Sequence, residues 1–256
     1  MSEVSDFVLA RGEYASLFAV VLLLGLSARP IARLLALERR AVGDLLWNGG
    51  LAFVVVGRLA YVVAESPRTL LDPLVLIRLP GGLEPLAGAI GVAAAVSWHA
   101  RRRDATWAWV TAAAVGLAVA TVGYDVACVL RDACYGAAAP PPLGFAMSGF
   151  SEARLATPLV EATVVLAAGA ALLMLAGRLS TASIALLLLG ALALVRAALT
   201  PASVLGVDAV GLETMLLAFG GAALLATALT LRFTAPERAA ARLGRGSLPC
   251  EADPQS

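Results

Sequence analysis

Seven long apolar segments constrain the fold of this chain more than any other feature of its sequence. Each approaches the ~20 residues that an α-helix needs to cross the hydrocarbon core of a bilayer. Only 14% of the 256 residues are charged, whereas a soluble domain carries about 25%. We therefore predict an all-α, polytopic membrane protein with seven transmembrane helices. The predicted spans are 14–35, 45–65, 86–100, 107–130, 159–177, 182–199 and 209–231.

Arginine, which supplies every basic residue of the chain, indicates how these spans are oriented. Because cytoplasmic loops are enriched in basic residues, we expect the arginine-rich end in the cytoplasm, the N-terminus outside and the C-terminus inside. We predict a membrane domain at 1–234, with an extracytoplasmic loop at 132–157. The polar stretch 235–256 lacks apolar periodicity, so we predict a disordered cytoplasmic tail. Twelve arginines mark the cytoplasmic end, against about five outside: Arg29, Arg33, Arg39, Arg40, Arg101, Arg102, Arg103, Arg178, Arg232, Arg238, Arg242 and Arg245.

Glycine inside the spans predicts close packing between helices. Small residues let the backbones of neighbouring membrane helices approach, because no side chain holds them apart. Gly88 and Gly91 can do this in the third span, and Gly220 and Gly221 can do it in the seventh.

Net charge and cysteine usage exclude several classes of site. The formal net charge is +1, which provides no bulk field to attract nucleic acid. The three cysteines and the single histidine form no metal-ligand pattern, so we predict no metal site. The spacing of Cys128 and Cys134 allows a disulfide, but it favours two small packing residues.

Ionisable side chains at a similar depth in five spans are the strongest functional signal. Arg58, Asp125, Glu161, Arg196 and Glu213 all fall in the half of their spans that we expect to face outward. Charged groups at membrane depth are costly, and by default they mark a functional site. Taken singly, each is explained equally well by an ion pair between helices.

A bound anion explains the set of arginines better than isolated ion pairs do. Arg131 and Arg154 lie near the same level as Arg58 and Arg196. Arginine binds phosphate through paired hydrogen bonds, and this is the depth of a phospholipid headgroup. We therefore predict an anionic phospholipid as the ligand. A water-filled path in a small solute transporter is the lesser alternative.

His99 is the one histidine available as a general base, but its position argues against that role. Thirteen residues separate it from Leu86, so about 20 Å of helix lies between His99 and the outer charges. We interpret it as part of an interfacial pair with Trp98, beside the basic cytoplasmic loop.

Six short motifs, in unbroken order between residues 14 and 231, resemble those of the prolipoprotein diacylglyceryl transferases. They are RGEYASLF around Tyr14, GRLAY from Gly57, PGGLEPLAGAIG from Pro80, ACVLRDACYG from Ala127, PPLGFAM from Pro141 and RLATPLVEA from Arg154.

This resemblance implies a transferase of the bacterial plasma membrane with seven spans and an outward N-terminus. Such an enzyme moves the diacylglyceryl group of phosphatidylglycerol to the lipobox cysteine of a prolipoprotein precursor and releases glycerol phosphate. The family needs no metal or organic cofactor. Its substrate-binding positions correspond here to Tyr14, Arg58, Tyr61, Arg131, Arg154, Glu161 and Arg196.

The chain departs from the family pattern at positions that carry chemistry. The family's histidine falls on Leu86, and one of its arginines falls on Asp125. A thiol needs a base to become a nucleophile, so the resemblance implies a substitute, either Glu84 or Asp125. The alternative is a catalytically inactive relative that keeps the fold and binds lipid or a protein partner.

Overall fold

The computed structural model describes residues 2–65, 84–103, 106–130, 136–140, 144–146, 151–175, 178–199 and 212–243. These residues are almost entirely helical, as predicted. The helices are α1 (Ser2–Leu34), α2 (Arg39–Glu65), α4 (Pro85–Arg101), α5 (Thr106–Leu130), α6 (Thr157–Leu175), α7 (Thr181–Leu199) and α8 (Leu212–Leu243).

Among the described residues, five helices are long and apolar enough to cross a membrane. They contain the stretches Leu17–Leu34, Arg39–Ala64, Thr106–Leu130, Thr157–Leu175 and Thr181–Leu199. The third predicted span forms α4, which has only 17 residues. The seventh forms α8, in which the described side chains include the apolar stretch Thr214–Leu229. The all-helical class is therefore confirmed, while the count of seven spans and their orientation stay predictions.

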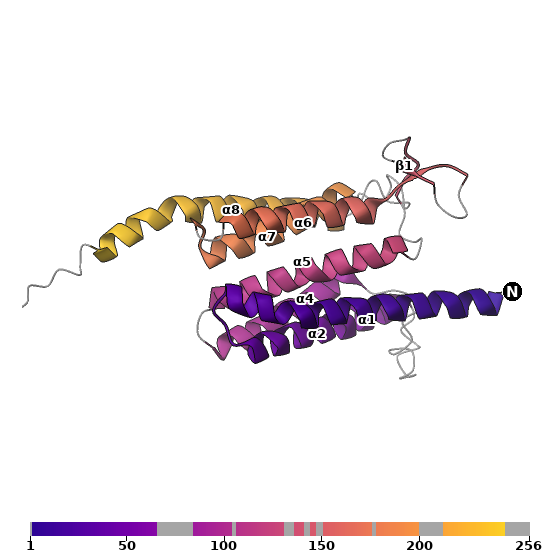
Figure 1. Cartoon of the computed structure of the whole chain (residues 1–256), viewed down its shortest axis with the longest axis horizontal. Helices are drawn as coiled ribbons and strands as arrows, with labels where there is room; N and C mark the ends of the chain where they lie inside the picture. Colours follow the sequence, from indigo (N-terminus) through magenta and orange to yellow (C-terminus); the bar gives the residue numbers. More distant parts are fainter. Residues whose placement is uncertain are drawn as a thin grey trace, which may run out of the picture.

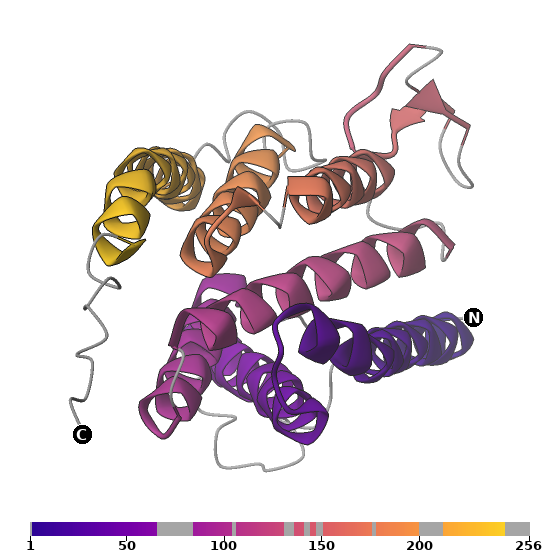
Figure 2. The same ribbon diagram turned by 60° about the vertical axis from the view of Figure 1, so that its left-hand side comes forward.

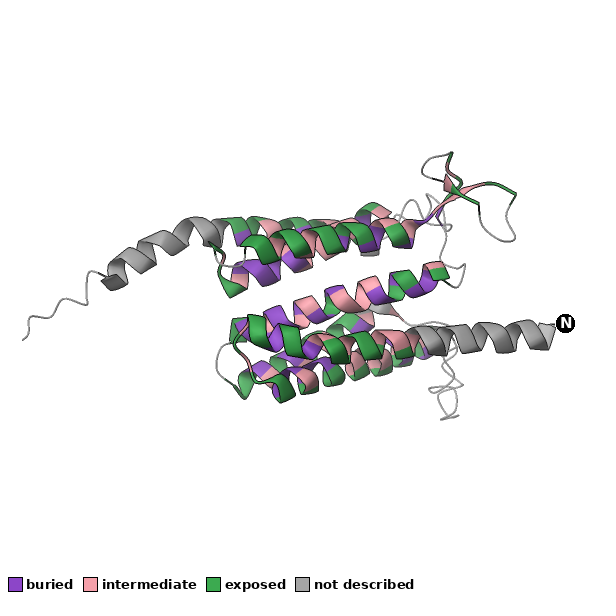
Figure 3. Ribbon diagram, viewed as in Figure 1, coloured by how far each residue is buried: buried purple, intermediate pink, exposed green. Residues whose placement is uncertain are grey.

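The helices form two groups with α5 between them. α1, α2, α4 and α5 pack together on one side, and α6, α7 and α8 lie on the other (Figure 1). α5 contacts both α6 and α7, and a second view shows it running between the groups (Figure 2). Exposed residues run along the described parts of α1 and α6, and they include large apolar side chains such as Phe18 and Leu166 (Figure 3). Such surfaces suit contact with lipid tails.

Close approach of α2 and α4 depends on glycine. A Cβ atom on Gly91 would lie 2.7 Å from the carbonyl oxygen of Ala52, and one on Gly88 would lie 2.7 Å from the Phe53 ring. The predicted role of these two glycines is therefore confirmed. On α8, Gly221 packs against Gly190 of α7, where an added Cβ would lie 3.0 Å from the Gly190 oxygen. Gly220 has nothing within 4 Å, so the same prediction is wrong there because that residue faces outward.

α5 and α7 lie side by side at Thr111 and Thr181, and this contact determines which residues meet further along the two helices. The buried hydroxyl of Thr111 lies 2.8 Å from the carbonyl oxygen of Thr181, the first residue of α7. Asp125 and Arg196 follow these two residues by nearly equal lengths of helix, on the order of 21–22 Å. The two charged residues therefore reach the same depth.

The turn between α1 and α2 closes with hydrogen bonds of the Schellman type. The Leu37 amide donates to the Ala32 carbonyl over 2.9 Å, and the Ala36 amide donates to Arg33 over 3.5 Å. Ala36 takes the left-handed conformation, with φ 52°, at a position where glycine is usual. Leu37 packs on the core next to Ile31 and Ala32. This contact holds α1 and α2 antiparallel.

Three findings differ from or add to the sequence predictions around the loops. Cys128 is disulfide-bonded, so the interpretation of it as a small packing residue is wrong. α8 continues to Leu243, where alanine, glutamate and arginine favour helix, and the disordered tail at 235–256 stays a prediction. Within the predicted outer loop, β1 (Gly144–Phe145) pairs antiparallel with β2 (Arg154–Leu155).

Candidate active site

Three charged residues from three helices meet at the end of α5. The Arg196 Nη1 atom of α7 donates a hydrogen bond of 2.7 Å to Glu161 Oε2 of α6. The Asp125 charge of α5 interacts with both of these groups. We call Asp125, Glu161 and Arg196 the α5–α7 cluster. Its ion pair joins α6 to α7, and Asp125 of α5 interacts with this pair only through its electrostatic field.

The two carboxylates of the α5–α7 cluster are buried, whereas its guanidinium is not. Asp125 is 2% exposed and Glu161 is 5% exposed. The Arg196 side chain keeps 55% of its surface exposed. Within the part of the chain that the structure describes, Asp125 Oδ2 is buried and has no hydrogen-bond partner. A buried polar atom without a partner is costly, and such atoms are often explained by function.

Tyr124 was not predicted to be part of this site. It is the residue next to Asp125, and it lies near enough to the Arg196 guanidinium for an electrostatic interaction. The sequence contained a signal for Tyr124, because a tyrosine next to Asp125 places a second polar group at nearly the same level of the helix.

Arg58, Tyr61 and Glu84 form a second group, which we call the α2 cluster. Arg58 is 4% exposed, and its guanidinium carbon lies 5.4 Å from the centre of the Tyr61 ring, one turn along α2. The Glu84 amide donates to the carbonyl of Gly57 over 3.0 Å, directly beside Arg58. Thus the residue before α4 is fixed on α2 by its backbone.

Local sequence explains why Glu84 stands at this point. Proline follows it and takes the first position of α4, where a missing amide costs nothing. A residue before proline prefers extended backbone, and Glu84 has φ −85° and ψ 106°. Its side chain does not cap the helix, which leaves the carboxylate available to other groups. The side chain of Leu86, the family's histidine position, lies outside the described residues.

Arg154 lies in the two-stranded ribbon that β1 and β2 form. It belongs to β2, and its Nη1 atom donates to the Gly136 carbonyl over 3.3 Å. Backbone hydrogen bonds surround Arg154: the Gly136 amide donates to the Leu155 carbonyl, and the Leu155 amide donates to the Ala137 carbonyl. Arg131 and the side chains of Tyr14 and Glu213 lie outside the described residues. The predicted arginines thus occupy at least three settings: the α5–α7 cluster, the α2 cluster and the ribbon.

His99 lies at the other end of the helices, as predicted, but with a different partner. Its ring packs edge-on against Trp109 of α5, with centroids 4.7 Å apart. Trp98 instead lies under Arg102, at 4.1 Å from the guanidinium carbon. The predicted Trp98–His99 pair is wrong because neighbours on a helix point about 100° apart. Among the described residues, no group of three or more His, Cys, Asp or Glu side chains could hold a metal ion.

The sequence matches the family model described as prolipoprotein diacylglyceryl transferase over residues 13–201. This range includes both clusters and the ribbon of β1 and β2. The chain belongs to this family. The resemblance in its motifs is therefore confirmed, and the long apolar helices make it a multi-pass membrane protein.

Similar proteins come from three strains of Vibrio cholerae serotype O1: Classical Ogawa 395, M66-2 and El Tor Inaba N16961. Each is a phosphatidylglycerol–prolipoprotein diacylglyceryl transferase that is 38% identical to this chain over 71 residues. That stretch is 27% of this chain, and it spans about a quarter (26%) of the length of each relative.

Proposed function

We propose that this protein transfers the diacylglyceryl group of phosphatidylglycerol to the lipobox cysteine of prolipoproteins in the bacterial plasma membrane. Family membership supports the reaction class. The observation that carries the proposal is the α5–α7 cluster, in which a buried carboxylate with an unpartnered oxygen stands beside a partly exposed arginine. This combination offers a base and a phosphate ligand at one depth.

The reaction needs two contributions from the protein. A carboxylate takes the proton from the cysteine thiol, and we assign this role first to Asp125, whose Oδ2 can accept it. The sulfur then bonds to the glycerol carbon as the carbon–oxygen bond to phosphate breaks. The leaving glycerol phosphate keeps the electron pair of that bond, and guanidinium groups stabilise its charge.

Arg196 is the first candidate for holding the phosphate. Its bond to Glu161 orients the guanidinium, while 55% of the side-chain surface stays exposed. A guanidinium has five N–H donors, so Arg196 can keep Glu161 and still donate to a phosphate oxygen. We place Arg58, Arg131, Arg154, Tyr14 and Tyr61 in the binding of the same lipid substrate, with Glu84 as the alternative base.

Two assays test this proposal. Cells depleted of their own diacylglyceryl transferase should grow when they express this protein, and purified protein should modify a lipobox peptide in vesicles containing phosphatidylglycerol. A peptide with serine in place of the lipobox cysteine is the control, because the hydroxyl is a far weaker nucleophile. Failure of rescue together with no modified peptide would contradict the proposal.

A second candidate function follows from the departures at the family's histidine and arginine positions. With Leu86 and Asp125 in these places, the protein can be a relative that binds anionic lipid or a partner without turnover. In that case the double variant Leu86→His with Asp125→Arg should gain activity that the unaltered protein lacks. Activity of the unaltered protein excludes this candidate.

A further inference from the structure

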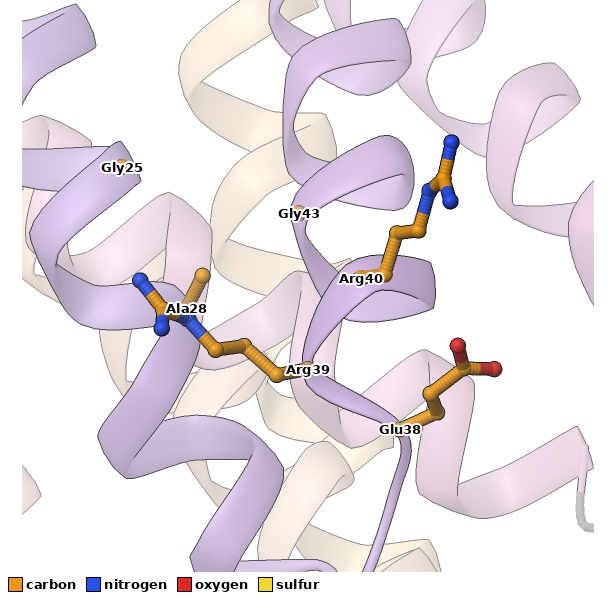
Figure 4. A pocket seen from close by; sticks show the side chains of 6 residues that line it. All are labelled: Gly25, Ala28, Glu38, Arg39, Arg40 and Gly43. Carbon is orange, nitrogen blue, oxygen red and sulfur yellow. The ribbon is translucent and has the colours of Figure 1, made fainter.

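A hollow of about 600 Å³ opens where α1 turns into α2 (Figure 4). Its lining combines small residues with charged ones: Gly25, Ala28, Glu38, Arg39, Arg40 and Gly43. Gly25 and Gly43 have nothing within 4 Å of an added Cβ, so the space in front of them is open. The size is within the range of small-molecule sites, about 300–1,000 Å³.

The charges at this hollow are not balanced within the protein. In the part of the chain that the structure describes, neither the Arg39 nor the Arg40 side chain takes part in a hydrogen bond or ion pair. In Figure 4 the Arg39 side chain extends toward Ala28 of α1, while Arg40 and Glu38 point to the other side of α2. A guanidinium above a floor of glycine and alanine suits a phosphate joined to an apolar chain.

The hollow is far from the candidate active site. The core beside it joins Ala28 and Leu45 to Trp109 near the start of α5. Asp125 lies sixteen residues further along that helix, or about 24 Å. The hollow therefore belongs to the arginine-rich end, which the positive-inside rule predicts to face the cytoplasm, whereas the α5–α7 cluster belongs to the opposite end.

We propose that this hollow binds the headgroup of an anionic glycerophospholipid, as a second lipid site separate from the transferase substrate. The phosphate contacts Arg39 at the rim, and the start of an acyl chain lies along Gly25, Ala28 and Gly43. Basic pockets between membrane helices are known to bind anionic lipid headgroups at the cytoplasmic face. The exposed face of α1 beside the hollow, with Phe18, Leu22 and Leu26, gives the acyl chain an apolar path.

Native mass spectrometry of the full chain in detergent tests this proposal by counting bound phosphatidylglycerol. The Arg39→Gln variant should lose one bound lipid, with at least a tenfold weaker affinity for it. Gly43→Leu should lose the same lipid by filling the hollow, and no atom lies within 4 Å to oppose its Cβ. Arg178→Gln, an exposed arginine outside the hollow, is the matched control and should retain the lipid.

Three further arms separate the possible results. Phosphatidylcholine should not occupy the hollow of the unaltered protein in place of phosphatidylglycerol, because its headgroup carries no net charge. Displacement of the lipid by soluble glycerol phosphate would overturn the proposal in favour of a soluble anion. Arg196→Gln should lower lipid binding at the substrate site but leave this one intact, so failure here is distinguishable from failure of the transferase proposal. Equal lipid counts in the Arg39→Gln variant and the unaltered protein would also overturn the proposal.

Discussion

The α5–α7 cluster and the α2 cluster both place arginine within apolar helices, but they are held by different forces. In the α2 cluster, Arg58 is buried against Tyr61 of its own helix, and Glu84 is attached through its backbone. In the α5–α7 cluster, Arg196 is half-exposed and bonds to Glu161 of another helix. The first arrangement depends on two backbones lying close together, and the second depends on charges meeting across three helices.

This difference separates a structural role from a chemical one. A buried arginine stacked on an aromatic ring stays in place, because moving it would expose the ring and bury a charge elsewhere. A partly exposed arginine beside two buried carboxylates can instead exchange contacts with a ligand at little cost. We therefore expect the α5–α7 cluster to control turnover and the α2 cluster to control stability and substrate binding.

The largest expected effect comes from comparing the two candidate bases. Asp125→Asn should lower transfer to a lipobox peptide by about 100- to 10,000-fold, the usual range for loss of a general base. The fold should tolerate the change, because asparagine has the same shape and removes a negative charge beside Glu161. Glu84→Gln should leave the rate close to that of the unaltered protein. The reverse result would assign the base to the α2 cluster.

Arg196→Gln should lower the rate by about 100-fold, since the leaving phosphate loses a charged donor. The rate of Arg196→Lys should lie between those of Arg196→Gln and the unaltered protein. Lysine restores the charge but lacks the planar group that reaches both Glu161 and a phosphate. Initial transfer rates at saturating lipid measure the effect of both variants. If the lysine and glutamine variants are as active as the unaltered protein, Arg196 serves only in an ion pair that joins two helices.

Gly91→Ala should lower the free energy of unfolding by about 1–3 kcal/mol, as overpacking of a tight contact does. The new Cβ would lie 2.7 Å from the Ala52 carbonyl oxygen, so α2 and α4 must move apart. Unfolding of the purified protein in detergent measures the change. Gly169→Ala on α6 is the matched control, because nothing lies within 4 Å of it. A loss of stability in both variants would mean that spacing of α2 and α4 is not the cause.

Tyr61→Leu has the smallest expected effect, a loss of about 0.5–2 kcal/mol in unfolding free energy, because Arg58 loses its aromatic face. Tyr61→Phe keeps the ring and should retain most of the stability. Equal losses in the two variants would point to the hydroxyl group rather than to the stacked guanidinium. We expect either variant to change apparent substrate affinity more than the maximal rate.

Much of the fold follows from one-dimensional patterns. Apolar length predicts the helices, and the shared level of Asp125, Glu161 and Arg196 follows from counting residues along each helix. Cys128 shows where this approach fails. Its spacing permits both packing and a disulfide, and only the folded chain joins it to a second sulfur.

By itself, the sequence determined the helical class, the family and the level at which charges occur, because hydropathy and rise per residue act along one axis. Tertiary structure decided which side chains meet at that level: Arg196 with Glu161, His99 with Trp109, and Gly221 rather than Gly220 with Gly190. The rotation of a helix about its axis and the identity of its neighbours depend on packing across the whole bundle. For the same reason, the hollow beside Arg39 exists only once α1 and α2 have folded back on each other.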